Sequence, residues 1–296
     1  MKKIISNFIL FAALVAISRT SLVLAEEVKD PGANEPEWAK RLSYNIEVET
    51  DRVPIFYFET IQPLYQDIDE TQTYFIQPRV SIKARDATYN LGTGYRKLIS
   101  ENWLLGANIF GDYQDDHGHG RVGIGGEALG KRLEARINGY WGVTSPRKVE
   151  EADGVITTLE RVIDGVDYEL GAPLPYLPWL KLYGAGYWWN YKYAGDRVGW
   201  KSRLEATINK FSVVEFYMWD DNKGEHEIGG KIGVKIPFDN WGDIRKTFIR
   251  LAEEPYPSKD LKEYNLIPVK RNFNIVVERW NETPSGKITV QVGRGN

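Results

Sequence analysis

Three histidines and a pair of aspartates are the side chains of this sequence best suited to bind a metal ion or move a proton. His117 and His119 follow Asp115 and Asp116 in the run DDHGH, and His226 stands far along the chain. Imidazole and carboxylate groups are ligands for zinc and related ions. Their spacing matches no metal motif, however, so we expect these residues to lie in solvated outer loops. We predict neither a metal site nor a bound cofactor.

The same residues could also serve an enzyme, as acid and base. A hydrolytic site needs a base beside a nucleophile or an activated water, and no serine lies in a nucleophile context. The run GIGG over 123–126 is rich in glycine, but it falls within a predicted strand instead of between a strand and a helix. It is therefore not a phosphate-binding loop. We predict that the protein is not an enzyme.

Charged and apolar side chains alternate through the middle of the chain, most clearly from Trp103 to Val143. This period of two predicts strands with one apolar and one charged face. The apolar faces end in tryptophan or tyrosine, which is typical of transmembrane barrel strands, and the charged faces would then line a lumen. The predicted lumen-lining residues are Arg121, Glu127, Arg132, Glu134, Arg136, Glu169, Arg203, Glu205 and Lys231. The predicted girdle residues at the membrane interfaces are Trp103, Tyr113, Trp141, Trp188, Trp189 and Trp200.

Two alternatives remain open for these side chains. The lumenal charges could line a hydrophilic conduit, or they could form cross-strand ion pairs that only hold the wall together, and both can apply. The aromatic cluster at the outer end of the segment 179–191 could stack on a glycan, but we expect it to belong to the girdle.

The composition is compatible with a membrane barrel. Mean hydropathy is −0.42 and no stretch beyond the amino end reaches 18 apolar residues, so no transmembrane helix is predicted. In a barrel only alternate residues face lipid, which keeps the mean low. The net charge of −3 argues against a nucleic-acid partner. There is no cysteine, and a closed sheet is one way for an exported protein to be stable without disulfides.

The amino end predicts export. Lys2 and Lys3 precede an apolar run over 4–17, and Val23 and Ala25 stand at the −3 and −1 positions of a cleavage site. We predict a Sec-type signal peptide over 1–25 and a short periplasmic lead over 26–41. The predicted location is the outer membrane of a Gram-negative-type bacterium.

Twelve extended segments follow, separated by turn residues. Their predicted ranges are 42–50, 55–65, 72–84, 86–98, 103–115, 119–129, 131–143, 164–173, 179–191, 197–208, 211–219 and 225–238. The predicted fold class is an all-β, closed antiparallel transmembrane β-barrel of about twelve strands over 42–238. If the amino end is periplasmic, the longest link, 144–163, follows the seventh strand and lies outside, whereas the tightest links lie inside. The inner and outer faces of the segments 179–191 and 211–219 cannot be assigned.

The pattern changes in the last part of the chain, over 239–296, for which we predict a linker helix and an extended tail in or through the pore. Asp243 could cap a helix over 243–253 that Pro255 and Pro257 would end. Three basic residues on that helix would pair with glutamates on the wall and plug the lumen. They are Arg245, Lys246 and Arg250.

Several runs resemble one known family, the inverse autotransporter β-domain of intimin- and invasin-like translocators. They are TGYR, GANIFGDY, HGRVGIGGEALG, LEARINGYWGV, VDYELGAPLPYLPWLKLYGAGYWW and PVKRNFNIVVE, in this order. The resemblance covers roughly 42–280. It implies a twelve-stranded outer-membrane barrel, a linker that threads the pore outward, and a passenger at the carboxyl end, usually a string of Ig-like adhesion domains.

The sequence departs from the family at both ends. An Ig-like domain needs about 100 residues, and only 281–296 remain beyond Trp280. The lead over 26–41 is also too short for the peptidoglycan-binding module of many members. We therefore expect a translocator or membrane-anchor barrel with a self-threaded tail and without a large passenger. The alternatives are a plain diffusion channel, or a surface-interaction barrel that uses outer loops such as 144–163.

The expected partners follow from this location. They are outer-membrane lipid, the barrel-assembly machinery and periplasmic chaperones, with no nucleic acid, and the oligomeric state is left open.

Overall fold

The computed structural model describes residues 37–152, 156–224, 226–235, 247–283, 286 and 288–291. The predicted signal peptide, most of the periplasmic lead, and Arg245 and Lys246 lie outside the described residues. No helix among the described residues is both long enough and apolar enough to cross a membrane.

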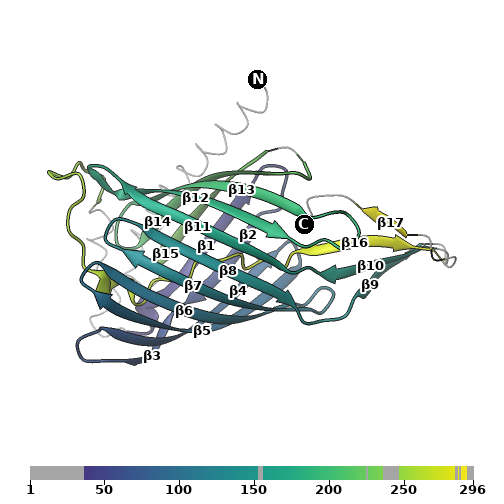
Figure 1. The fold of residues 1–296 in the computed structure, drawn as a ribbon, viewed down its shortest axis with the longest axis horizontal. Helices are drawn as coiled ribbons and strands as arrows, with labels where there is room; N and C mark the ends of the chain where they lie inside the picture. The colour runs from purple at the N-terminus through teal and green to yellow at the C-terminus, as the bar shows by residue number, and fades with distance from the viewer. Residues whose placement is uncertain are drawn as a thin grey trace, which may run out of the picture.

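The main body is a closed antiparallel barrel of twelve strands, as predicted (Figure 1). Its strands are β1 (Leu42–Glu49), β2 (Ile55–Thr60), β3 (Gln62–Gln66), β4 (Gln72–Lys83), β5 (Asp86–Ser100), β6 (Trp103–Gln114), β7 (His119–Gly130), β8 (Glu134–Gly142), β11 (Gly165–Leu174), β12 (Leu177–Trp189), β13 (Arg197–Thr207), β14 (Ser212–Asp221) and β15 (Glu227–Lys235). Both β2 and β3 pair with β4, so they form one wall strand interrupted at Ile61. The pairing of β1 with β15 closes the ring.

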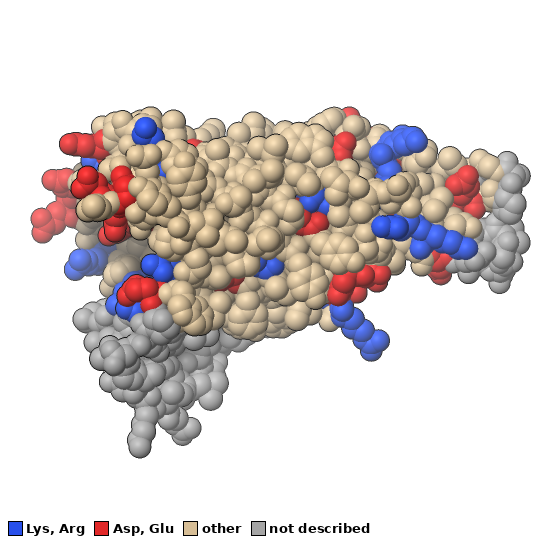
Figure 2. Space-filling view, turned by 90° about the horizontal axis from the view of Figure 1, so that it is seen from below, with Lys and Arg blue, Asp and Glu red and all other residues tan. Residues whose placement is uncertain are grey.

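Alternation along the strands separates the two surfaces of the wall. In β6, Trp103, Leu105, Ile109 and Tyr113 are exposed, whereas the intervening Leu104, Asn108, Phe110 and Asp112 are buried. The exposed large apolar side chains come from almost every wall strand. Figure 2 shows few charged residues on the middle of the outer surface and many at its two ends. An apolar band between polar ends is the surface that a bilayer covers.

A second, four-stranded sheet lies at one end of the barrel (Figure 1). The long link after β8 forms β9 (Arg147–Ala152) and β10 (Ile156–Val162), and the last part of the chain adds β16 (Val277–Glu282) and β17 (Ile288–Gln291). The strand order is β17-β16-β10-β9, with β16 antiparallel to β10. Strands β16 and β17 are thus tied to a loop that belongs to the barrel.

The predicted helix over 243–253 is wrong for its described part, since residues 247–253 are not helical. Backbone groups of this segment bond to barrel turns: the Phe248 N–H donates to the Ile208 carbonyl, and the Ala252 N–H donates to the Tyr176 carbonyl. Arg250 is exposed, so it does not plug the lumen. Two short 3-10 helices occur among the described residues, η2 (Ala39–Arg41) and η3 (Leu261–Tyr264).

Apolar residues inside the barrel pack against the last part of the chain. We call residues 247–283 the tail. Val269 and Phe273 of the tail join one buried cluster with Ile61, Phe75 and Phe110 of the wall. Leu261 joins a second cluster, together with the wall residues Leu104 and Leu129. The core of this molecule therefore lies between the inner wall and the tail.

Candidate functional site

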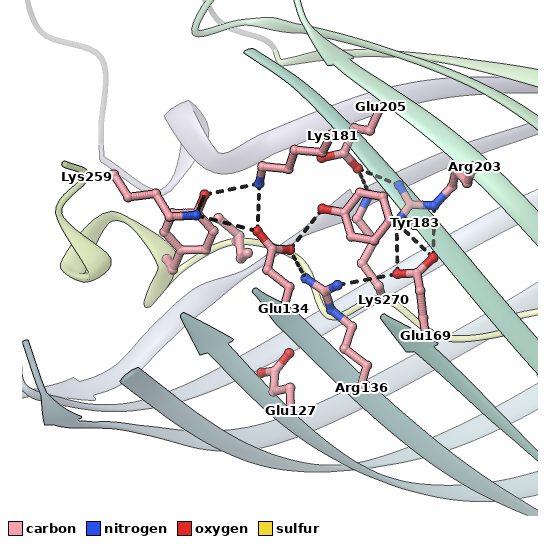
Figure 3. A network of polar contacts seen from close by, with 12 residues as sticks. Glu127, Glu134, Arg136, Glu169, Lys181, Tyr183, Arg203, Glu205, Lys259 and Lys270 are labelled. Carbon is pink, nitrogen blue, oxygen red and sulfur yellow. Dashed lines mark hydrogen bonds and ion pairs between the residues drawn. The ribbon is translucent and has the colours of Figure 1, made fainter. Parts of the chain in front are cut away.

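The lumen carries a network of buried charges contributed by neighbouring strands (Figure 3). Arg136 Nη2 lies 2.8 Å from Glu134 Oε2, and its Nη1 lies 3.3 Å from Glu169 Oε2. Arg203 continues the network, with Nη2 at 2.8 Å from Glu169 Oε2 and Nη1 at 2.6 Å from Glu205 Oε2. Alternate cationic and anionic side chains thus follow β8, β11 and β13, so each buried charge has an opposite neighbour.

Lysines of the tail complete this network. Lys270 Nζ lies 3.1 Å from Glu205 Oε2 and 2.8 Å from Glu215 Oε1, and Lys231 of β15 contacts the same Glu215 oxygen at 2.5 Å. Lys259 Nζ lies 3.7 Å from Glu134 Oε1. Figure 3 shows Lys259 and Lys270 approaching the network from the tail. The wall carboxylates are therefore shared between the barrel and its own carboxyl-terminal segment.

Arg96 of β5 binds the tail through its backbone. Its guanidinium is fully buried, and Nε donates to Glu127 Oε1 at 2.6 Å. Its Nη1 donates to the carbonyl oxygens of Tyr264, Asn265 and Ile267 at 3.0, 2.9 and 2.7 Å. Because carbonyl oxygens are present in any sequence, this contact recognises the path of the chain instead of its side chains.

A second arginine cluster lies further along the lumen. Arg121 Nε and Arg271 Nη2 both lie 2.8 Å from Asp112 Oδ2, and Arg121 also donates to the carbonyls of Asn274 and Asn272 at 2.9 and 2.7 Å. Gly123 of β7 faces this point, where a Cβ atom would lie 2.5 Å from Arg271 Nη2. A larger residue at this position would therefore displace the Arg271 side chain.

Further bonds hold the tail between these clusters. The Val269 N–H donates to Gln77 Oε1 at 2.9 Å, Asn90 Nδ2 donates to the Phe273 carbonyl at 3.1 Å, and the Asn272 N–H donates to the Tyr140 hydroxyl at 2.8 Å. The side-chain partners come from wall strands β4, β5 and β8.

The tail bonds to both ends of the barrel. At one end Asn265 Nδ2 donates to the Glu70 carbonyl in the turn before β4, and Tyr176, between β11 and β12, donates its N–H to the Pro255 carbonyl. At the other end the Ile163 N–H donates to the Val276 carbonyl. An extended chain from Asn265 to Val276 reaches about 36 Å, close to the ~30 Å thickness of a bilayer's hydrocarbon core.

The structure places most of the predicted lumen residues in these interior pairs, whereas Arg132 lies elsewhere. Interior pairs involve Arg121, Glu127, Glu134, Arg136, Glu169, Arg203, Glu205 and Lys231. Arg132 is exposed in the turn between β7 and β8, where its guanidinium lies 5.2 Å from the ring centre of Tyr256. The prediction for Arg132 is wrong because β8 begins only at Glu134.

The predicted girdle residues divide in the same manner. Five of them are exposed on the outer surface: Trp103, Tyr113, Trp141, Trp188 and Trp200. Trp189 is 3% exposed and packs inside with Tyr140, Ile163 and Tyr191, so its assignment to the girdle is wrong. Adjacent strand residues face opposite ways, so Trp188 and Trp189 cannot both meet lipid.

Sequence reasoning missed several residues that build the lumen. Lys181 and Tyr183 bind Glu134, and Glu215 binds Lys231. The three missed residues, Lys181, Tyr183 and Glu215, lie in the two strands where both faces carry apolar or aromatic residues. The tail cations Lys270 and Arg271 were also missed. The run VKR, which lies in the part of the tail that resembles the family, was the available signal.

Two of the three histidines meet at the barrel end that carries the four-stranded sheet. His119 Nε2 lies 2.8 Å from Glu160 Oε1, and His117 Nδ1 lies 3.5 Å from the same oxygen. Burial alone would raise the pKa of Glu160, but hydrogen bonds from His119 and Arg279 outweigh it and lower that pKa. The loop prediction fits His226, which is exposed, but His119 is fully buried. The contact of Glu160 with the two histidines was not predicted, because Glu160 lies far from both of them in the sequence.

Comparison with known proteins identifies the architecture. The family model described as inverse autotransporter, beta-domain, matches residues 36–209. The chain belongs to this family. It is 28% identical over 141 residues to the putative attaching and effacing protein homolog of Escherichia coli (strain K12), a match that covers 48% of this chain and 45% of that protein. The chain therefore spans about half the length of this curated relative.

Two solved structures are similar to this chain, and the first of them supports the fold. One, described as "Unveiling the Mechanism Behind the in-meso Crystallization of Membrane Proteins", is similar with a TM-score of 0.63 and 17% identity, over 81% of this chain and 99% of that one. The COG4313 outer membrane channel from Pseudomonas putida F1 aligns with a TM-score of 0.48 and 10% identity, over 70% of this chain and 99% of that one. Membership of the inverse autotransporter family makes this an outer-membrane type of barrel, and its apolar band implies a lipid environment.

Proposed function

We propose that this inverse autotransporter β-domain is a translocator and membrane anchor, whose barrel holds its own tail threaded from the periplasmic side to the cell surface. In this arrangement the barrel conducts an extended chain outward and afterwards retains it. The proposed domain division is a signal peptide over 1–25, a lead over 26–41, the barrel over 42–238, and a linker with an extended segment over 239–296 that includes the tail. Assembly would use periplasmic chaperones and the barrel-assembly machinery, as for other barrels of this kind.

The observation that carries the proposal is the set of wall groups that bind tail backbone. Arg96 and Arg121 together donate to five carbonyls between Tyr264 and Asn274. A wall that binds main-chain groups can accept many sequences in extended form. The interior is therefore suited to conduct a polypeptide, whereas an open channel for small solutes has no need of such donors.

Single cysteines test the threading, because the chain contains no native cysteine. Thr289 lies on β17 of the four-stranded sheet, and Ser258 lies near the opposite end of the barrel. Both side chains are exposed, so each position is replaced by cysteine in a separate variant. Intact cells are treated with a membrane-impermeant maleimide. We expect Thr289→Cys to label in intact cells, and Ser258→Cys to label only after the outer membrane is permeabilised.

The reverse pattern would invert the proposed orientation. Labelling of neither position in intact cells, in protein that is folded and membrane-bound, would overturn the threading.

A further inference from the structure

We propose that His117, His119 and Glu160 form a binding site for a divalent transition-metal ion, Zn²⁺ in particular. We call these three residues the rim cluster. They come from the loop after β6, the first residue of β7 and the hairpin strand β10. Their candidate ligand atoms all lie within 4.8 Å of one another.

The geometry fits a tetrahedral ion. With metal–ligand bonds of about 2.0–2.1 Å, tetrahedral ligand atoms lie about 3.3 Å apart. Glu160 Oε1 lies 2.8 Å from His119 Nε2 and 3.5 Å from His117 Nδ1. Two imidazoles and one carboxylate are a known zinc ligand set that leaves one position open. All three ligand atoms lie within 4.8 Å of one another, so the histidine side chains would have to close around the ion to reach tetrahedral spacing.

The burial of the rim cluster and the surroundings of His117 Nδ1 support a bound ion at this position. His119 and Glu160 are 0% and 1% exposed, and His117 Nδ1 is a buried atom that contacts carboxylate oxygens without a well-aligned hydrogen bond. Asp116 Oδ2 lies 3.0 Å from that atom and could supply the fourth ligand. An imidazole nitrogen that faces two carboxylates in this way is arranged as a metal ligand would be, and an ion between them would use its lone pair.

Arg279 of β16 fits the role of an outer partner. Its Nε contacts Glu160 Oε2, which leaves Oε1 directed at the two histidines. Carboxylate ligands are commonly oriented by such second contacts. Asp116 and Glu160 bring two carboxylates to the cluster, and the guanidinium groups beside it include Arg279 at Glu160 and Arg147, which donates to the Gly118 carbonyl at 3.5 Å. An ion here would join the barrel rim, the outer hairpin and, through Arg279, the tail.

The test uses the full chain, purified without a histidine tag, folded in detergent micelles and stripped with a chelator. Equilibrium dialysis against ZnCl₂, followed by elemental mass spectrometry, measures bound zinc. We expect one Zn²⁺ per chain, and at least a tenfold loss of affinity in His117→Asn and His119→Asn. Co²⁺ in place of Zn²⁺ should give the visible absorption of a tetrahedral site.

His226→Asn is the matched control, since it removes an exposed histidine outside the cluster. It should bind zinc as the unmodified chain does. If His119→Asn fails to fold, judged by heat-modifiable mobility, the less buried His117→Asn decides. The absence of stoichiometric zinc in the unmodified chain, or an equal loss in His226→Asn and His117→Asn, would overturn the proposal.

Discussion

Asp112 joins two guanidinium groups from different parts of the chain, Arg121 of the wall and Arg271 of the tail. The other carboxylate oxygen, Asp112 Oδ1, accepts a hydrogen bond from Asn90 Nδ2 at 2.8 Å. The Asp112 side chain is 0% exposed, so little solvent could replace its carboxylate as a partner of the two guanidinium groups. When one member of a buried charge cluster is removed, the remaining charges stay desolvated without compensation.

We therefore expect Asp112→Asn to lower the free energy of unfolding by about 3–5 kcal/mol. Urea unfolding of the barrel in lipid vesicles, followed by tryptophan fluorescence, would measure the change. Asp69→Asn is the control, since Asp69 is exposed in a turn and should change stability by no more than about 0.5 kcal/mol. Equal stability of the two variants would show that the arginines find other partners.

The alternation of charged and apolar residues was enough to predict, for most side chains, which face of the wall they occupy. Charges on strands with one clearly apolar face could be placed on the inner wall from sequence. The failures have local causes. Trp189 follows another tryptophan, and composition cannot say which of two neighbours faces lipid; Arg132 stands just before its strand begins. Partners brought together from distant segments, such as His119 and Glu160, leave no local signal.

At the scale of elements, hydrogen bonds hold strand β16 to the loop after β12, and we call the contact of Glu278 with residues 192–194 the latch. The Glu278 carboxylate accepts the backbone N–H groups of Lys192, Tyr193 and Ala194, together with Arg161 Nε at 2.9 Å. Burial would raise the pKa of Glu278, but these donors outweigh it and hold that pKa below its ordinary value of 4.5. A carboxyl with a depressed folded pKa stabilises the latch above its unfolded pKa.

This latch should weaken in acid, as the pH falls through the folded pKa of Glu278, below 4.5. The backbone amide NMR shifts of Lys192, Tyr193 and Ala194 would report the protonation, with an expected midpoint under 4.5. In Glu278→Gln the same shifts should not titrate in this range. A midpoint at or above 4.5 in the unmodified chain would contradict the expected latch.

The strands of the wall could be predicted because each has its own period and its own turns. For the last part of the chain the sequence predicted an extended segment in or through the pore, but not its local structure, which depends on what surrounds it. The predicted helix from 243 has the right spacing of apolar residues, yet residues 247–253 bond to the barrel turns. Strand β16 likewise forms because β10 offers it an edge. Tertiary contacts decide the structure of such segments.

At the scale of the whole molecule, the barrel and the tail share one core. Phe273 and Val269 pack against the inner wall at one level, and Leu261 packs at another. The lumenal ion pairs lie around the same segment. A barrel of twelve strands would otherwise enclose a polar space open to ions.

Deleting residues 261–296 should therefore raise the single-channel conductance of the protein in planar bilayers at least severalfold, because the apolar clusters and the shared ion pairs lose the partner that occupies the lumen. The matched control deletes only 286–296, which leaves the segment between Leu261 and Val276 in place and should keep the low conductance. Heat-modifiable mobility would verify that both shortened barrels are folded. If both deletions conduct like the full chain, the tail does not close the lumen, and the wall side chains themselves must form the barrier.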